Sequence, residues 1–200
     1  NATVQSDGSL TFSGAWNGTF KAAKEATTCP AWILYDLLTN SRYGYGDQIA
    51  ESQLDKFAFY SCSAYNNAQI DNGLGGTEPR FAFNGSIQKQ GSAYGLINNL
   101  CATMRAQAIW SVGALTISQD SPKDSSYLFT LANVADGGFT YTGSSVKTRA
   151  TQINVSYFSN DSQSIDWEEV DDTAMQAKYG IVSKNVKAFG CTSRGQARRL

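Results

Sequence analysis

The sequence predicts an α+β fold in which a helix-rich α+β subdomain is followed by a mainly antiparallel, barrel-like β subdomain. Apolar residues recur at helical spacing in three segments before Pro122, and short β-branched and aromatic segments separated by Gly, Asn and Ser follow it. The 200 residues also suffice to bury a core without disulfides or metals. We therefore expect a β segment at 1–27, an α+β subdomain at 28–122 and a β-rich subdomain at 123–200.

The first elements are a strand or hairpin and a buried helix. Residues 9–20 alternate and are punctuated by glycine, which predicts extended structure belonging to a region that begins before this sequence. A helix is expected over 27–40, since Pro30 fits a first helical turn, where its missing N–H costs nothing.

A second helix is expected over 51–69. Ser52 and Asp55 have the spacing of a capping box at its start. Its apolar face would consist of Leu54, Phe57, Ala58, Cys62 and Tyr65.

The glycine-rich segment 71–79 predicts a loop, and the alternation over 80–88 predicts a strand after it. A third helix is expected over 91–106, capped by Ser92. Its apolar face would consist of Ala93, Leu96, Ile97, Leu100, Cys101 and Met104.

A hairpin over 107–120, turning near Val112 and Gly113, closes the α+β subdomain. Beyond it the composition is typical of an antiparallel barrel or sandwich. The strands are expected at 127–130, 138–145, 148–159, 163–170 and 181–190.

Two short helices complete the β-rich subdomain. One starts at Asp171 or Asp172 and stops at Gly180, and the other is capped by Thr192 or Ser193. Only about two turns of the last helix are present, which cannot bury much surface, so we expect the domain to continue past it.

Composition excludes several classes of function. The net charge of -1 leaves no basic surplus for nucleic-acid binding through counterion release. No apolar run approaches the ~20 residues of a membrane span, since Asp36 interrupts the longest candidate. The sequence contains no histidine, which excludes Ser-His-Asp and Cys-His catalysis and His-ligated metal sites.

Four cysteines, Cys29, Cys62, Cys101 and Cys191, lie far apart and form no CxxC pair. A zinc site would usually draw its ligands in close pairs. We therefore interpret them as small buried hydrophobic residues in a reducing compartment, and expect neither a metal nor another cofactor.

The segment 188–197, "AFGCTSRGQA", combines a cysteine, two hydroxyls and an arginine. A phosphatase-type thiolate loop needs its arginine six positions after the cysteine, whereas Arg194 and Arg198 follow Cys191 by three and seven. A turn at Gly190 that leads into a capped helix is the better interpretation.

Two charged segments are further candidates for a functional site. Residues 71–80 lack the lysine of a phosphate loop, and Glu78 and Arg80 there could pair with each other. An acidic run could supply a calcium site or a glycosidase carboxylate pair, but a solvated strand and an acidic helix start are favoured. Its members are Asp161, Asp166, Glu168, Glu169, Asp171 and Asp172.

Aromatic residues make up 12% of the chain. Exposed rings could bind sugars, but most of them fall on the apolar phase of expected helices and strands, where core packing explains them.

Several segments, in order from about Thr28 to Leu200, resemble the central part of the lambda-type phage tail-tip attachment proteins, the J or host-specificity family. They are "CPAWILYDLLTNSRYGYG", "LDKFAFYSCSAYN", "GGTEPRFAFN", "ISQDSPKDSSYLFT" and "AFGCTSRGQARRL". The motif residues are Pro30, Ala31, Trp32, Gly76, Thr77, Glu78, Pro79, Arg80, Phe189, Gly190, Cys191, Thr192, Ser193, Arg194 and Gly195. The family often has histidine where this chain has Arg198.

The resemblance implies a non-enzymatic virion protein of the tail tip, made and assembled in the bacterial cytoplasm. It implies a baseplate-hub homotrimer that closes the tail tube, contacts other tail proteins and links the tube to the host-recognising fibre for attachment and DNA ejection. DNA would pass through such a ring without specific binding, and no membrane insertion is expected. We expect ring interfaces among residues 41–46, 71–80 and the acidic run. Two alternatives remain: a receptor- or carbohydrate-binding module, and a cell-wall glycosidase using Glu168 or Glu169.

Overall fold

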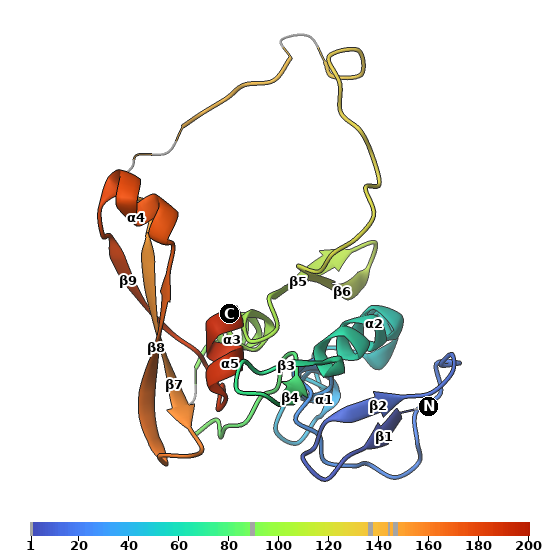
Figure 1. Ribbon diagram of the computed structural model, residues 1–200. Coiled ribbons are helices and arrows are strands. Elements are labelled where there is room, and N and C mark those ends of the chain that lie inside the picture. Colours follow the sequence, from blue (N-terminus) through green and yellow to red (C-terminus); the bar gives the residue numbers. More distant parts are fainter. Residues whose placement is uncertain (1, 89–90, 136–137, 144, 146–147) are drawn as a thin grey trace.

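The computed structural model describes residues 2–88, 91–135, 138–143, 145 and 148–200, and confirms an α+β fold (Figure 1). The elements are β1 (Ala2–Val4), β2 (Leu10–Phe12), α1 (Pro30–Thr39), the 3₁₀ helix η1 (Glu51–Gln53), α2 (Lys56–Asn67), β3 (Gln69–Asp71), β4 (Thr77–Pro79), α3 (Ala93–Ala102), β5 (Ala106–Ser111), β6 (Ala114–Gln119), β7 (Gln152–Ser159), β8 (Ser164–Asp171), α4 (Thr173–Tyr179), β9 (Ser183–Lys187) and α5 (Arg194–Arg199).

Helices α1, α2 and α3 surround the main core. Helix α1 begins at Pro30 as expected, and its Leu34 and Leu38 are fully buried. Phe59 of α2 and Leu100 of α3 pack into the same cluster, with no exposed surface. Because Leu10 of β2 joins this cluster, the β1–β2 hairpin packs on the helical unit.

The expected start of α2 was wrong. Asp55 itself caps the helix, accepting a hydrogen bond from the backbone N–H of Ala58 at 3.1 Å, and Ser52 lies in η1. The apolar face is also displaced, since Phe57 is 53% exposed and Phe59 is buried instead. The buried positions of α2 are Phe59, Cys62, Ser63, Asn66 and Asn67.

The cap of helix α3 and the hairpin after it follow the expectation, although the helix is shorter than expected, with Ala93 exposed and Met104 buried beyond its end. Ser92 caps α3 by accepting a hydrogen bond from Gly95 N–H at 3.1 Å. Strands β5 and β6 pair antiparallel and turn at Val112 and Gly113, both of which have positive φ.

The strand expected over 80–88 does not form. The alternation is real, because Phe81 and Phe83 are both buried, but the nearby strand pair is β3–β4. Backbone groups of 81–83 are paired instead with separate segments: Phe81 N–H donates to Asn66 O and Phe83 N–H to Thr28 O. An alternating pattern thus predicts which side chains are buried, but it does not predict which segment pairs with the backbone.

The β-rich half is an open sheet in the order β8-β7-β9, and the described residues form no closed barrel. Strand β7 pairs antiparallel with β8 and parallel with β9, and α4 connects β8 to β9 with Asp172 as its N-cap. No strand forms at 127–130 or in the described part of 138–145, from which Ser144 is excluded. Instead the described part of this connection arches away from the rest of the molecule (Figure 1).

A second, smaller core lies between this sheet and α5. It consists of Val155, Tyr157, Ala188, Cys191 and Ala197. Helix α5 is capped by Ser193, one of the two residues expected for this role. In the described part of the chain, no helix is long and apolar enough to cross a bilayer.

Candidate functional site

Two of the three motif segments meet in space. The turn around β4 (residues 76–84) contacts the segment 189–199, which includes α5, although more than a hundred residues separate them. We call this contact the α5 joint. It lies where the helical unit meets the three-stranded sheet (Figure 1).

Glu78 is the anchor of the joint on the β4 side. Its carboxylate accepts a hydrogen bond from the hydroxyl of Ser193 and forms an ion pair with Arg199, whose Nη2 lies 2.7 Å from Glu78 Oε1. The side chains of Glu78 and Arg199 are 17% and 22% exposed, so little water screens the pair. The expected Glu78–Arg80 pair does not form: the Arg80 guanidinium lies 4.3 Å from the Tyr65 ring centroid, a cation–π contact.

Gln196 connects the joint to the segment that failed to form a strand. This side chain is 2% exposed, accepts a hydrogen bond from Ala82 N–H at 3.0 Å and donates one to Ala82 O at 2.8 Å. The amide thus replaces a neighbouring strand and satisfies both backbone groups of Ala82. The joint is further held by Asn84 N–H, which donates to Gly190 O at 2.8 Å.

Two glycines permit the close approach of the segments. Gly190 has a φ of +65°, and a Cβ there would lie 2.2 Å from the Phe83 ring. A Cβ on Gly195 would lie 2.3 Å from Glu78 Oε1 and 2.9 Å from Asn72 O. Any larger residue at either position would push the segments apart.

The opposite side of α5 is tied to the sheet. Glu168 of β8 is 5% exposed, and its carboxylate binds Arg194 Nε at 2.7 Å and Arg198 Nη1 at 3.3 Å. The expectation of a solvated acidic run is therefore wrong for Glu168, although the other members of the run are exposed. Helix α5 thus presents arginines to carboxylates on both units, Glu78 and Glu168.

Cys191 lies inside the joint with 1% exposure. Burial raises the pKa of its thiol to about 11, and the thiol donates to Ser193 O at 3.2 Å. A thiol with this pKa stays protonated at neutral pH and is a poor nucleophile. The structural interpretation of 188–197 is therefore favoured over a thiolate loop.

We predict that none of the four cysteines reacts rapidly with Ellman's reagent in the native protein. All four are free and no more than 4% exposed, and burial raises the pKa of Cys62 to about 12 and that of Cys101 to about 11. The measurement is thiol release at about pH 8, with the guanidinium-unfolded chain as the control that shows all four thiols. A rapid burst from Cys191 alone in the native chain, absent from Cys191→Ser, would contradict the structural role.

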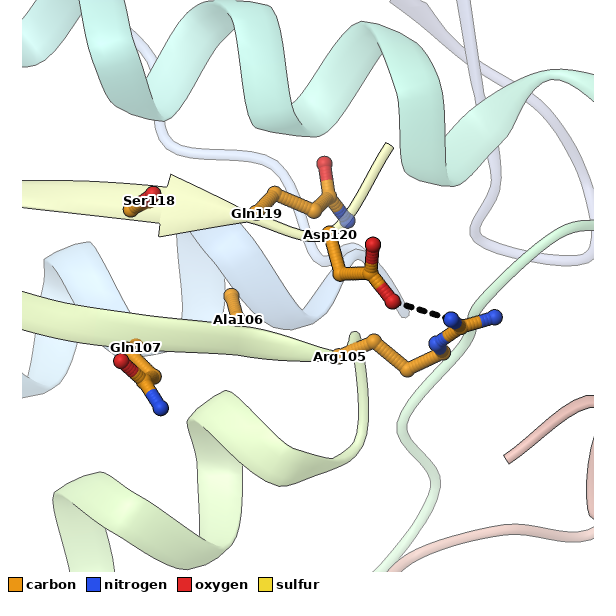
Figure 2. Close-up of a pocket in the computed structure, with 6 residues that line it drawn as sticks. All are labelled: Arg105, Ala106, Gln107, Ser118, Gln119 and Asp120. Carbon is orange, nitrogen blue, oxygen red and sulfur yellow. Dashed lines mark hydrogen bonds and ion pairs between the residues drawn. The ribbon is translucent and has the colours of Figure 1, made fainter. Parts of the chain in front are cut away.

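The hollow drawn in Figure 2 offers no catalytic arrangement. It has a volume of about 490 Å³ and is lined by Arg105, Ala106, Gln107, Ser118, Gln119 and Asp120. Its one acid, Asp120, is paired with Arg105, as Figure 2 shows. Gln119 is also occupied, donating to Asn66 Oδ1 at 2.6 Å and to Met104 O at 2.8 Å. Over the described residues, no three Cys, Asp or Glu side chains are placed to hold a metal ion.

The third motif segment forms the start of α1, and Thr28 just before it accepts a hydrogen bond from Phe83 N–H at 2.8 Å. Pro30 and Ala31 are buried, and the Trp32 ring makes edge contacts with Trp16 at 5.9 Å and Phe20 at 5.6 Å between centroids. This aromatic cluster extends through Trp16 to Tyr60 of α2, stacked at 5.2 Å. These rings pack against one another, but the expectation that core packing explains most aromatics was wrong, since many other rings, such as Tyr94 and Trp167, are exposed.

Sequence reasoning missed Gln196 and the partners of Arg194, Arg198 and Arg199. One signal was available: Arg194 and Arg198 are four apart on a helix, so both guanidinium groups project from the same face. That spacing predicts a shared carboxylate. Which carboxylate it is depends on the fold, because Glu168 lies on a different element.

Comparison with known proteins decides the family. A family model described as "Putative phage tail protein" matches residues 92–200, which is more than half of the chain. The chain belongs to this phage tail protein family. The match spans α3 to α5 and includes the α5 half of the joint.

Two relatives confirm the resemblance inferred from the motifs. The chain is 40% identical over 191 residues to the tip attachment protein J of Escherichia phage SECphi27, covering 94% of this chain and 16% of the relative. It is 31% identical over 194 residues to the protein of the same name from Escherichia phage SECphi4, covering 94% of this chain and 17% of the relative. The chain thus spans about a sixth of the length of these relatives.

Proposed function

We propose that this chain is a structural component of the phage tail tip. It would form part of a homotrimeric hub that closes the tail tube, contacts other tail proteins and links the tube to the host-recognising fibre. The motif residues would hold the subdomains of each copy together. DNA would pass through the ring without specific binding, and assembly would take place in the bacterial cytoplasm.

The α5 joint is the observation that supports this proposal best. The polar groups of the joint and of the contact between α5 and β8 are engaged with one another: Glu78 with Ser193 and Arg199, Glu168 with Arg194 and Arg198. Side chains whose polar atoms are bound within the protein favour a structural role, because a catalytic group must remain available to a substrate. The same contacts disfavour Glu168 as a glycosidase acid, and Glu169 accepts a hydrogen bond from Gln152 at 2.8 Å.

The proposal is tested with a phage whose own gene for this protein carries a Glu78→Ala change. We expect a large loss of infectious particles at raised growth temperature, and a smaller number of complete tails in electron micrographs. The matched control is Glu25→Ala, which also removes one carboxylate but only from an exposed pair with Lys21. Immunogold labelling of wild-type particles should mark the tail tip.

Three results would count against the proposal. Label away from the tail tip would remove the assigned location. Peptidoglycan hydrolysis by the purified wild-type protein, abolished by Glu168→Gln or Glu169→Gln, would instead support the glycosidase. Saturable adhesion of the isolated chain to host cells would support the receptor-binding alternative.

A further inference from the structure

The three-stranded sheet has two open edges. Strand β7 is central, and among the described residues no strand adds to the outer side of β8 or of β9. All of β9 is exposed, as are most residues of β8. Open edges present unpaired N–H and C=O groups, which are templates for another strand.

The two edges carry opposite charges. Strand β8 has the exposed carboxylates Asp166, Glu169 and Asp171, whereas β9 has the exposed ammonium groups of Lys184 and Lys187. Two copies meeting at identical edges would bring like charges together, while β8 against β9 brings opposite charges together. Charge complementarity therefore favours a heterologous contact over a two-fold one.

The strand directions fit the same contact. Strand β8 runs antiparallel to β7 and β9 runs parallel to it, so β8 and β9 run in opposite directions. If the next copy extends the sheet with its strands in the same order and the same orientation, its β8 lies antiparallel to β9 of the first copy. Antiparallel ladders are the more stable kind, and a head-to-tail contact generates a ring when the rotation closes.

An exposed apolar patch lies beside the β8 edge. Phe158 pairs with Ile165 and Ser156 with Trp167, so the three large side chains share one face of the sheet. Phe158, Ile165 and Trp167 are 44%, 67% and 55% exposed. An exposed apolar patch of this kind often marks a protein–protein contact.

We propose that copies of this chain associate edge to edge, with β8 of one copy pairing antiparallel with β9 of the next. This inference rests on the homotrimeric ring of the proposed function and assigns its contact surface. It places Glu169 and Asn185 near each other across the interface, because both pair with Asn154 within one copy and therefore lie at the same height of the sheet.

Cross-linking tests the contact. The full-length protein with Glu169→Cys and Asn185→Cys is treated with a short bismaleimide, whose reach tolerates a small change of register. We expect covalent dimers and trimers on a denaturing gel, with the trimer as the largest species. Each single variant should give no trimer, which also controls for other cysteines of the full-length protein, and the four cysteines of this chain are too buried to contribute. The control pair Lys21→Cys with Lys123→Cys, at two exposed positions away from the three-stranded sheet, should give no ladder.

Charge reversal provides the second measurement. Lys184→Glu with Lys187→Glu should weaken association in sedimentation equilibrium by more than about tenfold. Adding Asp166→Lys with Glu169→Lys to the same chain should restore it, and Lys21→Glu with Lys123→Glu should have no effect. A trimer insensitive to these changes, with no cross-links, would overturn the edge contact and leave the ring intact. A protein that stays monomeric at every concentration would overturn both.

Discussion

Replacing Gly190 with alanine is expected to destabilise the 200-residue chain by about 3 kcal/mol. The residue has a φ of +65°, a region that costs a side chain energy, and its Cβ would lie 2.2 Å from two atoms of the Phe83 ring. Phe83 is 6% exposed, and its ring centroid lies 5.2 Å from that of Phe189, so it has little space into which to move. The measurement is the melting temperature by circular dichroism, with an expected loss of about 6–12 °C.

The matched control is Gly91→Ala. Gly91 has no atom within 4 Å of its ideal Cβ position and no positive φ, so this change should leave the melting temperature nearly unchanged. If Gly190→Ala is as stable as Gly91→Ala, the close approach of the two motif segments is wrong.

Replacing Glu78 with alanine is expected to cost about 2 kcal/mol of the free energy of unfolding. The change leaves Arg199 without its carboxylate, in a place where the arginine side chain is 22% exposed and its Nε is already buried without a partner. It also removes the acceptor of the Ser193 hydroxyl. The residual exposure of the pair keeps the figure below that of a fully buried pair. Urea unfolding measures it.

A double-mutant cycle with Arg199→Ala isolates the interaction. The second change should cost much less in the Glu78→Ala background, giving a coupling energy of about 1–2 kcal/mol. A matched cycle on the exposed pair Lys21 and Glu25 should give about 0.5 kcal/mol or less. Additive losses at Glu78 and Arg199 would show that this ion pair does not hold the joint.

Local signals in the sequence were sufficient for much of the fold. Pro30 marked the start of α1, Ser92 and Asp172 the caps of α3 and α4, and the β5–β6 turn fell where expected. These features depend on neighbouring residues, so a single sequence contains them.

The errors concern long-range pairing. Phe81 and Phe83 alternate as in a strand, yet the backbone between them is satisfied by a side chain 114 residues away, that of Gln196. Glu168 looked like part of a solvated acidic run, but it is buried because two arginines of α5 neutralise it. No local pattern identifies such partners, since they become neighbours only after the chain folds.

The functional inference also combined local signals in the sequence with contacts that only the fold creates. Composition and the missing histidine excluded the common catalytic arrangements, and the motifs indicated the family that the comparisons then confirmed. The physical role of the motifs emerged only in the structure. Between residues 76–80 and 189–195, Glu78 accepts a hydrogen bond from Ser193 and lies where a Cβ on Gly195 would be.

Hydrogen–deuterium exchange of the full-length protein tests the central claim, that these two motif segments form one structural joint. In the wild type, amides of α5 such as Ala197 and Leu200, which donate within the helix, should be protected together with those of 81–84. In Glu78→Ala both segments should lose protection together, while α1 keeps it. Unchanged protection of α5, or loss confined to residues around Glu78, would contradict the account.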